Sequence, residues 1–187
     1  METILCALLL SAAEDSALAT SISPFRYFTT SVFFEEAQLK NSANNQVLDF
    51  NDEAAFSFGI GTMASDSLIV EAHYQGNELS ESNGDFKRDF EYDQFGLTLA
   101  YEVDVNDRVS FTPRVGVAHT DWDVDIDDDD FGTINADGSD LTWKYGFNVE
   151  YNVDNISLYA GYMFQQGEFG PVEFVSDGLL FGASFTF

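Results

Sequence analysis

Hydrophobic and polar residues alternate along most of this chain with a period of two, which is the spacing of a β-strand with one apolar face. The clearest alternation runs from Leu141 to Tyr151, where apolar and aromatic residues occupy every odd position. Similar alternation predicts eight strands, over residues 25–36, 54–64, 68–76, 92–103, 109–120, 141–151, 156–166 and 178–187. The last strand ends on Phe187, an unusual end for a soluble sheet because an exposed aromatic edge promotes aggregation. A closed barrel would pair this strand with the first one, near Tyr27–Glu35.

The connections between these strands alternate between short and long. Tight turns are expected at residues 65–67, 104–108 and 152–155, and long polar segments at 37–53, 77–91, 121–140 and 167–177. An even number of strands with this rhythm is typical of a transmembrane β-barrel with short periplasmic turns and long extracellular loops. A β-sandwich would distribute its connections less regularly. The predicted fold class is therefore an all-β, eight-stranded antiparallel outer-membrane barrel.

The face opposite the apolar residues carries small and charged side chains. Seven of the 14 glycines lie there: Gly59, Gly61, Gly96, Gly116, Gly146, Gly161 and Gly182. Small residues suit the narrow interior of an eight-stranded barrel. The same face carries Glu71, Glu102, Arg114, Lys144 and Glu150. Charges inside a membrane barrel need partners, so these five residues are predicted to form a structural network of salt bridges that plugs the lumen.

Composition narrows the class of protein further. The 187 residues suit one domain, and 33 acidic residues against 7 basic ones give a formal charge of -26, which argues against nucleic acid as a partner. No stretch reaches the roughly 18 to 20 apolar residues that a membrane-spanning helix needs. A membrane-spanning barrel has no such apolar stretch, because its lipid-facing and lumen-facing residues alternate.

The N-terminus has the features of a targeting segment. Residues 4–13 are apolar, and Ala17-Leu18-Ala19 fits the small-x-small pattern before a cleavage site. We therefore expect a signal peptide over residues 1–19 and a barrel domain over 20–187, with a buried N-terminal helix as the alternative. A basic n-region is missing because Glu2 follows Met1, so the start codon and the cleavage site stay open. Cys6, the only cysteine, would leave with the signal, and the mature chain could form no disulfide.

Two stretches of the predicted strands resemble a known family. Residues 144–162, together with the closing strand at 178–187, resemble the C-terminal hairpin and last strand of OmpX/Ail-type outer-membrane proteins. Residues 95–118 similarly resemble the central hairpin of the OmpA-like and opacity-protein group. The resemblance implies a bacterial outer-membrane location, with lipopolysaccharide as a neighbour. It also implies that the barrel-assembly machinery recognises an assembly signal formed by Phe181, Phe185 and Phe187.

The most acidic segment is a candidate cation site. Residues 121–140 hold nine aspartates and no lysine or arginine, and an aspartate recurs at every second position at Asp121, Asp123, Asp125, Asp127 and Asp129. The EF-hand pattern fails, because Ile126 stands where glycine is needed and Gly132 where glutamate is needed. A looser divalent-cation site stays open. A solvated, self-repelling loop is the favoured interpretation.

The sequence contains only part of a possible catalytic site. Some barrels of this type modify lipid A with a histidine, a serine and an acid at the outer rim. Here His119 and Asp121 are separated by Thr120, no His-x-Ser pair is present, and His73 has no obvious partner. A positioned base needs a nucleophile within reach and an orienting group. The chain is therefore predicted not to be an enzyme, and no cofactor or transition-metal site is expected.

The leading functional hypothesis is a barrel with a plugged lumen and a structural or surface-interaction role. Its acidic extracellular loops would contact ions, lipopolysaccharide or another external surface. Two alternatives stay open: a narrow small-solute channel and a lipid A-modifying enzyme. A soluble lipocalin-like barrel is disfavoured because it would need an apolar interior, whereas here the glycines and charges share the inner face.

Overall fold

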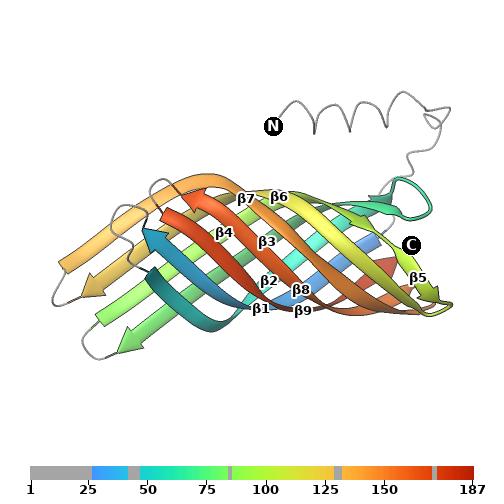
Figure 1. Ribbon diagram of the computed structural model, residues 1–187, viewed down its shortest axis with the longest axis horizontal. Coiled ribbons are helices and arrows are strands. Elements are labelled where there is room, and N and C mark those ends of the chain that lie inside the picture. The colour runs from blue at the N-terminus through green and yellow to red at the C-terminus, as the bar shows by residue number, and fades with distance from the viewer. Residues whose placement is uncertain (1–26, 42–46, 84–85, 129–131, 170–171) are drawn as a thin grey trace, which may run out of the picture.

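The computed structural model describes residues 27–41, 47–83, 86–128, 132–169 and 172–187, so the expected signal segment lies outside it. The strands are β1 (Tyr27–Asn41), β2 (Val47–Met63), β3 (Leu68–Asn83), β4 (Phe86–Tyr101), β5 (Val103–Asn106), β6 (Val109–Asp128), β7 (Gly132–Val153), β8 (Ile156–Phe169) and β9 (Val172–Thr186). β4 and β5 are one barrel strand interrupted at Glu102, because both pair with β6. The nine segments therefore form an eight-stranded antiparallel barrel (Figure 1).

The barrel closes between its first and last strands, as predicted. β1 pairs with β9 from Tyr27 opposite Thr186 up to Asn41 opposite Val172. Closure gives the C-terminal strand, which the alternation left as an exposed aromatic edge, a partner along its whole length. No helix in the described ranges is long and apolar enough to cross a membrane.

The outer surface of the barrel carries an apolar band of the height that a bilayer requires. On β7 the outward row runs through Leu141, Trp143, Tyr145, Phe147, Val149 and Tyr151, all exposed to the surroundings. Eleven strand residues rising about 3.3 Å each, tilted by about 45°, span roughly 25 Å. At the outer limit of the band, the hydroxyls of Tyr74 and Tyr162 donate hydrogen bonds to Asp93 and Asp177. Phenol rings bonded to acids at this height fit the interface between lipid and water.

Tight turns join the strands at the periplasmic end. Asp154 adopts a positive φ of 54° between β7 and β8, a conformation that aspartate tolerates better than most residues. The Asn106 side chain accepts hydrogen bonds from the backbone N–H groups of Arg108 and Val109. These local bonds satisfy the turn backbone, so the short connections predicted from the sequence are confirmed.

At the extracellular end the strands are longer than predicted. Most of the residues expected in long polar loops, 37–53, 77–91, 121–140 and 167–177, instead continue the hairpins. The hydrophobic alternation reverses there, with apolar residues inside and acidic ones outside. A β-bulge between Glu35 and Ala37 in the β1–β2 pairing shifts the register, and Phe50 is buried on the inner side of β2. Polar outward residues produced the expectation of loops, but they are the solvated face of paired strands.

These extensions form a two-layered structure outside the membrane band. In the described residues, β2 and β3 pair no further than Phe56 opposite Gly76, and β7 and β8 no further than Thr142 opposite Gly167. The other pairings continue outward, so the barrel separates into one sheet of β2-β1-β9-β8 and another of β3-β4-β6-β7. We call this region the extracellular sandwich. Its two gaps are the β2–β3 seam and the β7–β8 seam, at the left end of Figure 1.

The extracellular sandwich has its own hydrophobic core. The core cluster contains Ala37, Leu39, Phe50, Leu79, Phe90, Tyr92, Phe169 and Phe174. Aromatic pairs join the two sheets: the ring centroids of Phe90 and Phe174 lie 5.7 Å apart, and those of Trp122 and Phe169 lie 5.4 Å apart in a stacked pair. This cluster holds the two sheets together where they share no backbone ladder.

Inside the membrane band the glycines permit close approach between strands. A Cβ on Gly146 would collide with the backbone of Tyr162 on β8, and one on Gly161 would collide with the backbone of Phe147 on β7. The narrow interior of an eight-stranded barrel leaves no room for both side chains and backbone at these positions. The inward placement of glycine that the alternation predicted is therefore a packing requirement.

Candidate functional site

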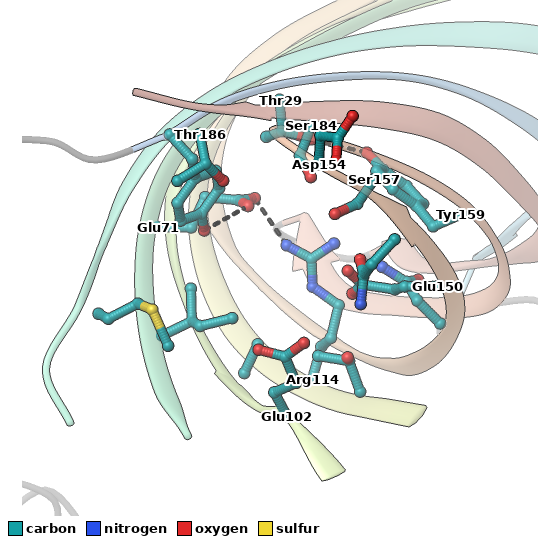
Figure 2. Close-up of a pocket in the computed structure, with 17 residues that line it drawn as sticks. Thr29, Glu71, Glu102, Arg114, Glu150, Asp154, Ser157, Tyr159, Ser184 and Thr186 are labelled. Carbon is teal, nitrogen blue, oxygen red and sulfur yellow. Dashed lines mark hydrogen bonds and ion pairs between the residues drawn. The ribbon is translucent and has the colours of Figure 1, made fainter. Parts of the chain in front are cut away.

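The lumen begins at the periplasmic end with a polar cavity of about 240 Å³. Arg114 projects into it from β6, and its Nη2 atom lies 2.8 Å from Oε1 of Glu71 on β3 (Figure 2). The hydroxyl of Tyr27 donates to the other carboxylate oxygen of Glu71 at 3.0 Å. Both charged side chains are almost fully buried, so each depends on the other for compensation.

A second cation lies farther along the lumen. Lys144, 3 % exposed, donates to Oε1 of Gln75 at 2.8 Å, and its Nζ lies 3.2 Å from Nε2 of His73. Nδ1 of His73 lies 3.3 Å from the hydroxyl of Thr98. This arrangement gives His73, which had no obvious partner in the sequence, two neighbours from other strands. A cavity of only about 30 Å³ remains around these groups.

A buried carboxylate lies beneath the extracellular sandwich. Glu35 on β1 is 1 % exposed and accepts hydrogen bonds from Tyr92 and Ser176. Asn77 donates to it at 2.5 Å and Gln165 at 3.5 Å. The four donors lie on β3, β4, β8 and β9, so Glu35 joins both sheets at the level where they separate. Satisfied in this way, a buried acid is a strong cross-link.

The predicted lumen network is only partly assembled. The structure brings Glu71 and Arg114 together as an ion pair, whereas Lys144 bonds to Gln75 and neighbours His73 rather than any of the predicted acids. Glu102 and Glu150 line the periplasmic cavity around Arg114 (Figure 2). Parity along a strand says which residues face inward. It does not say which of them meet across the barrel.

The sequence prediction did not place Glu35 in the lumen. Phe33 and Phe34 are neighbours and therefore lie on opposite faces of the strand, so the alternation did not show which face is inside. The polar residues Thr29 and Ser31 on the same parity were the signal that could have placed Glu35 inside. The sequence prediction also did not include apolar residues inside the lumen. Phe33, Ala55, Tyr159 and Leu180 form a buried cluster within the lumen, so the inner face is not purely polar.

The outer face of the extracellular sandwich is acidic over β4, β6 and β7. Register places carboxylates directly opposite one another: Asp89 faces Asp125, Glu91 faces Asp123, and Asp93 faces Asp121. Asp137 on β7 faces Asp123 from the other side. A shallow groove of about 590 Å³ lies over the Glu91–Asp123 and Asp93–Asp121 rows and Asp137. Like charges in opposed positions destabilise a sheet, so this face, which we call the acidic face, carries an energetic cost.

One lysine moderates the acidic face at its outer end. Lys87 donates a hydrogen bond to Asp89 on the same strand. The ammonium holds the pKa of the Asp89 carboxyl below its usual range, and the carboxylate in turn raises the pKa of Lys87. Both groups therefore stay charged near neutral pH, and Asp89 has a counter-charge beside it.

The candidate cation residues do not converge where they are described. Asp121, Asp123 and Asp125 alternate along β6 and face Asp93, Glu91 and Asp89 in separate rows of the ladder. Within the described ranges, no group of three acidic or histidine side chains could hold a metal ion. The side chains of Asp127 and Asp129 lie outside the described residues. The divalent-cation site therefore stays a prediction.

His119 and Asp121 do come together on the outside of β6. Nε2 of His119 lies 3.4 Å from Oδ1 of Asp121, and both side chains are largely exposed at the edge of the apolar band. A histidine and an acid without a placed nucleophile make an incomplete catalytic arrangement.

The protein-family model of the outer membrane protein beta-barrel domain matches residues 3–187, which is nearly the whole chain. The chain belongs to this family. It is an outer-membrane barrel of bacteria, as the resemblance in its closing strands implied. No curated protein matches the sequence.

Solved structures show the same fold at low identity. Ail from Yersinia pestis aligns with a TM-score of 0.55 and 16% identity, over 87% of this chain and 99% of that one. Neisserial surface protein A aligns at 0.59 and 18%, over 86% and 97%. A major outer membrane protein from Thermus thermophilus aligns at 0.52 and 13%, over 86% and 99%. At these identities the likeness concerns the fold alone.

Membership of this family gives the C-terminal phenylalanines a context. Phe181, Phe185 and Phe187 all face outward and are exposed on the lipid side of β9 and just beyond it. That outward row is the arrangement expected of an assembly signal. Its recognition by the barrel-assembly machinery stays a prediction.

Proposed function

We propose that this barrel is a non-enzymatic outer-membrane protein with a plugged lumen that acts at the cell surface through its acidic extracellular part. The observation that carries this proposal is the extracellular sandwich, which combines an apolar interior with an acidic exterior. The interior supports closure of the lumen and the exterior supports contact with the surroundings.

Three successive levels of side chains support a plugged lumen. The aromatic cluster lies between the two extracellular sheets, the Glu35 hydrogen bonds lie beneath it, and the Arg114–Glu71 pair lies at the periplasmic end. Solute passage would require all three levels to open. Opening the pair alone would leave a buried charge without compensation.

Conductance in planar bilayers tests the plug. Pure protein should give no stable unitary current, because the cavities are separated by packed side chains. The double variant Phe90→Ala/Phe174→Ala removes two rings from the aromatic cluster and serves as a loosened comparison, provided that heat-modifiable migration shows a folded barrel. A reproducible unitary current from the unaltered protein would establish the small-solute channel instead.

The acidic face supports a surface role. Its carboxylates lie on paired strands, and all of them except the half-buried Asp89 are exposed. Such a face attracts cations and basic surfaces and repels polyanions. Ail has been crystallised with the heparin analogue sucrose octasulfate, a polyanion, so the charge here favours the opposite class of ligand.

Retention of vesicles tests this role. Vesicles that carry the barrel should adhere to a polylysine-coated surface at low salt, and Asp121→Asn/Asp123→Asn should reduce that retention. Asp66→Asn, at a periplasmic turn, is the matched control. Equal retention of vesicles with and without the barrel would contradict the surface role.

Lipid A modification is the alternative that the contact between His119 and Asp121 keeps open. A histidine oriented by an acid at the lipid interface is one part of such a site. The proposal expects His119→Ala to leave the lipid A acylation pattern of the host membrane unchanged, as judged by mass spectrometry. A changed pattern would show that the barrel is an enzyme.

A further inference from the structure

The polar cavity at the periplasmic end of the lumen contains more acidic than basic groups. Four carboxylates line it, those of Glu71, Glu102, Glu150 and Asp154. Arg114 is the only lysine or arginine among the described residues of the lining, and its Nη2 atom lies 2.8 Å from Glu71. Figure 2 shows Glu102 and Glu150 beside the same side chain. Carboxylates that share a confined space repel one another, so a cation from outside would be stabilised there.

The exposure of these acids increases from the inner end of the cavity to its mouth. Glu71 is buried, Glu102 and Glu150 are half-buried, and Asp154 is exposed at the turn between β7 and β8. The ion pair of Arg114 with Glu71 lies at the inner end, where the next cavity has a volume of only about 30 Å³. The periplasmic cavity is therefore a blind pocket, and a ligand would enter it past Asp154.

A buried hydroxyl in the lining has no hydrogen-bond partner. Thr112 on β6 is 1 % exposed and lines the cavity, and its Oγ1 atom makes no hydrogen bond within the described residues. The carboxyl group of Glu150 lies close to this hydroxyl but outside hydrogen-bonding geometry. A buried polar atom without a partner costs free energy, so such atoms are rare. A donor that reaches the space between Thr112 and Glu150 would satisfy both groups.

Part of the cavity wall is apolar. Met63 on β2, Ile69 on β3 and Ala100 on β4 line it together with the acids. A metal ion gains nothing from such a wall, and within the described ranges no three acidic or histidine side chains could hold one. A methylene chain, in contrast, would pack against it. The volume of about 240 Å³ is below the roughly 300–1,000 Å³ of pockets for drug-sized ligands, so the ligand is a small one.

We propose that the periplasmic cavity binds a short linear diamine. One ammonium group would lie between Glu102 and Glu150 and donate a hydrogen bond to the hydroxyl of Thr112. The other would lie near Asp154 at the mouth, with the methylene chain against the apolar part of the wall. The site is at the opposite end of the barrel from the acidic face. The inference therefore goes beyond the proposed surface function and does not depend on it.

Calorimetric titration tests the proposal. The probe is putrescine, titrated into the full-length barrel in nanodiscs of zwitterionic lipid. Butylamine keeps the chain and one ammonium group, and butanediol keeps the chain without charge. Putrescine should bind at one site per barrel, roughly tenfold or more tightly than butylamine, and butanediol should not bind. Magnesium ions at the concentration of the diamine should displace little of it, because the carboxylates do not converge on one point.

Variants locate the site. Glu102→Gln/Glu150→Gln keeps the shape of the lining, removes two charges and should weaken putrescine binding roughly tenfold or more. Thr112→Val removes only the hydroxyl and should weaken binding roughly threefold or more. Asp66→Asn/Asp107→Asn makes the same change of charge at exposed periplasmic turns outside the cavity and should leave binding unchanged.

Stability provides a second measurement on the same variants. Putrescine should raise the denaturant midpoint of the unaltered barrel, because a ligand that binds only the folded state stabilises it. It should not raise the midpoint of Glu102→Gln/Glu150→Gln. Heat-modifiable migration confirms that each variant is folded before it is titrated.

The outcomes separate this inference from the proposed function. Equal affinity for butylamine and putrescine, ready displacement by magnesium, or full binding by Glu102→Gln/Glu150→Gln would show that the cavity does not recognise a diamine. If Asp66→Asn/Asp107→Asn is as harmful as the cavity variant, the cations merely gather at the surface and the inference is wrong. The retention of vesicles on polylysine is measured separately, so its failure beside intact putrescine binding would remove the surface role alone.

Discussion

At the scale of single residues, the lumen contains polar side chains that are buried together with charged or hydrogen-bonding partners. Arg114 has Glu71, Lys144 has Gln75 and a histidine neighbour, and Glu35 receives four donors. Removing one member of such a group leaves the other without compensation in a place that water does not reach easily. The expected cost is therefore larger than the contribution of the bond itself.

Arg114→Ala should destabilise the barrel by roughly 3–5 kcal/mol, because it leaves the Glu71 carboxylate buried without its cation. Denaturant unfolding in liposomes measures the loss. Arg114→Met combined with Glu71→Met removes both charges and should recover most of the stability. Arg108→Ala, at an exposed periplasmic turn, is the control. A single variant that unfolds at the same denaturant concentration as the unaltered protein would show that the pair contributes little.

At the scale of elements, each long strand has two parts with opposite alternation. The membrane part of β4 places Phe95 and Leu97 outward, where both are more than half exposed, and the extracellular part places Phe90 and Tyr92 inward, where both are buried. The same backbone thus serves a barrel in lipid and a sandwich in water. The two parts meet near Glu35, whose hydrogen bonds connect the sheets at the transition.

Phe90→Ala should loosen the extracellular sandwich and leave the membrane barrel intact. Truncation of a fully buried phenylalanine costs roughly 3–5 kcal/mol, and Phe90 packs on Phe50, Tyr92 and Phe174. Protease added to whole cells should cut the variant faster within the extracellular parts of β4 and β6, residues 86–93 and 121–128, while its heat-modifiable migration persists. Phe95→Ala, on the lipid side of the same strand, should not increase cleavage. Unchanged protease resistance in Phe90→Ala would argue that the core cluster does not stabilise the outer hairpins.

At the scale of the whole molecule, charge is distributed unevenly. The formal charge of -26 is accompanied by a dense acidic face outside the membrane band. Self-repulsion of that face opposes the extracellular sandwich and is reduced by salt. The barrel embedded in lipid, whose outward residues are apolar, should respond less.

The stability of the extracellular sandwich should therefore rise with ionic strength. Between about 10 mM and about 150 mM salt the screening length falls from roughly 30 Å to roughly 8 Å. Asp123→Asn removes a carboxylate that faces both Glu91 and Asp137, and it should stabilise the sandwich at low salt and flatten the salt dependence. Hydrogen exchange of the β4–β6 amides is the measurement, with Asp66→Asn as control. Slower exchange at low salt than at high salt would contradict the argument.

The period-two alternation along the whole chain, the alternating short and long connections and the terminal Phe187 were sufficient to predict an eight-stranded outer-membrane barrel that closes on its last strand. They were sufficient because a period of two is a local property, and it determines which residues share a face of a strand. Which face lies inside depends on the surroundings of the strand, which the pattern alone does not describe. The acidic segments were therefore expected to be loops, although Leu79, Phe90 and Phe174 supply a buried face there.

Contacts across the lumen could be identified only from the tertiary structure. The pairing of Lys144 with Gln75, the joining of four strands by Glu35 and the two seams depend on register and on where each ladder stops. These features arise from residues far apart in the chain, whose meeting is determined by closure of the barrel. Local alternation determined the faces of the strands, and closure, bulge and burial determined the neighbours.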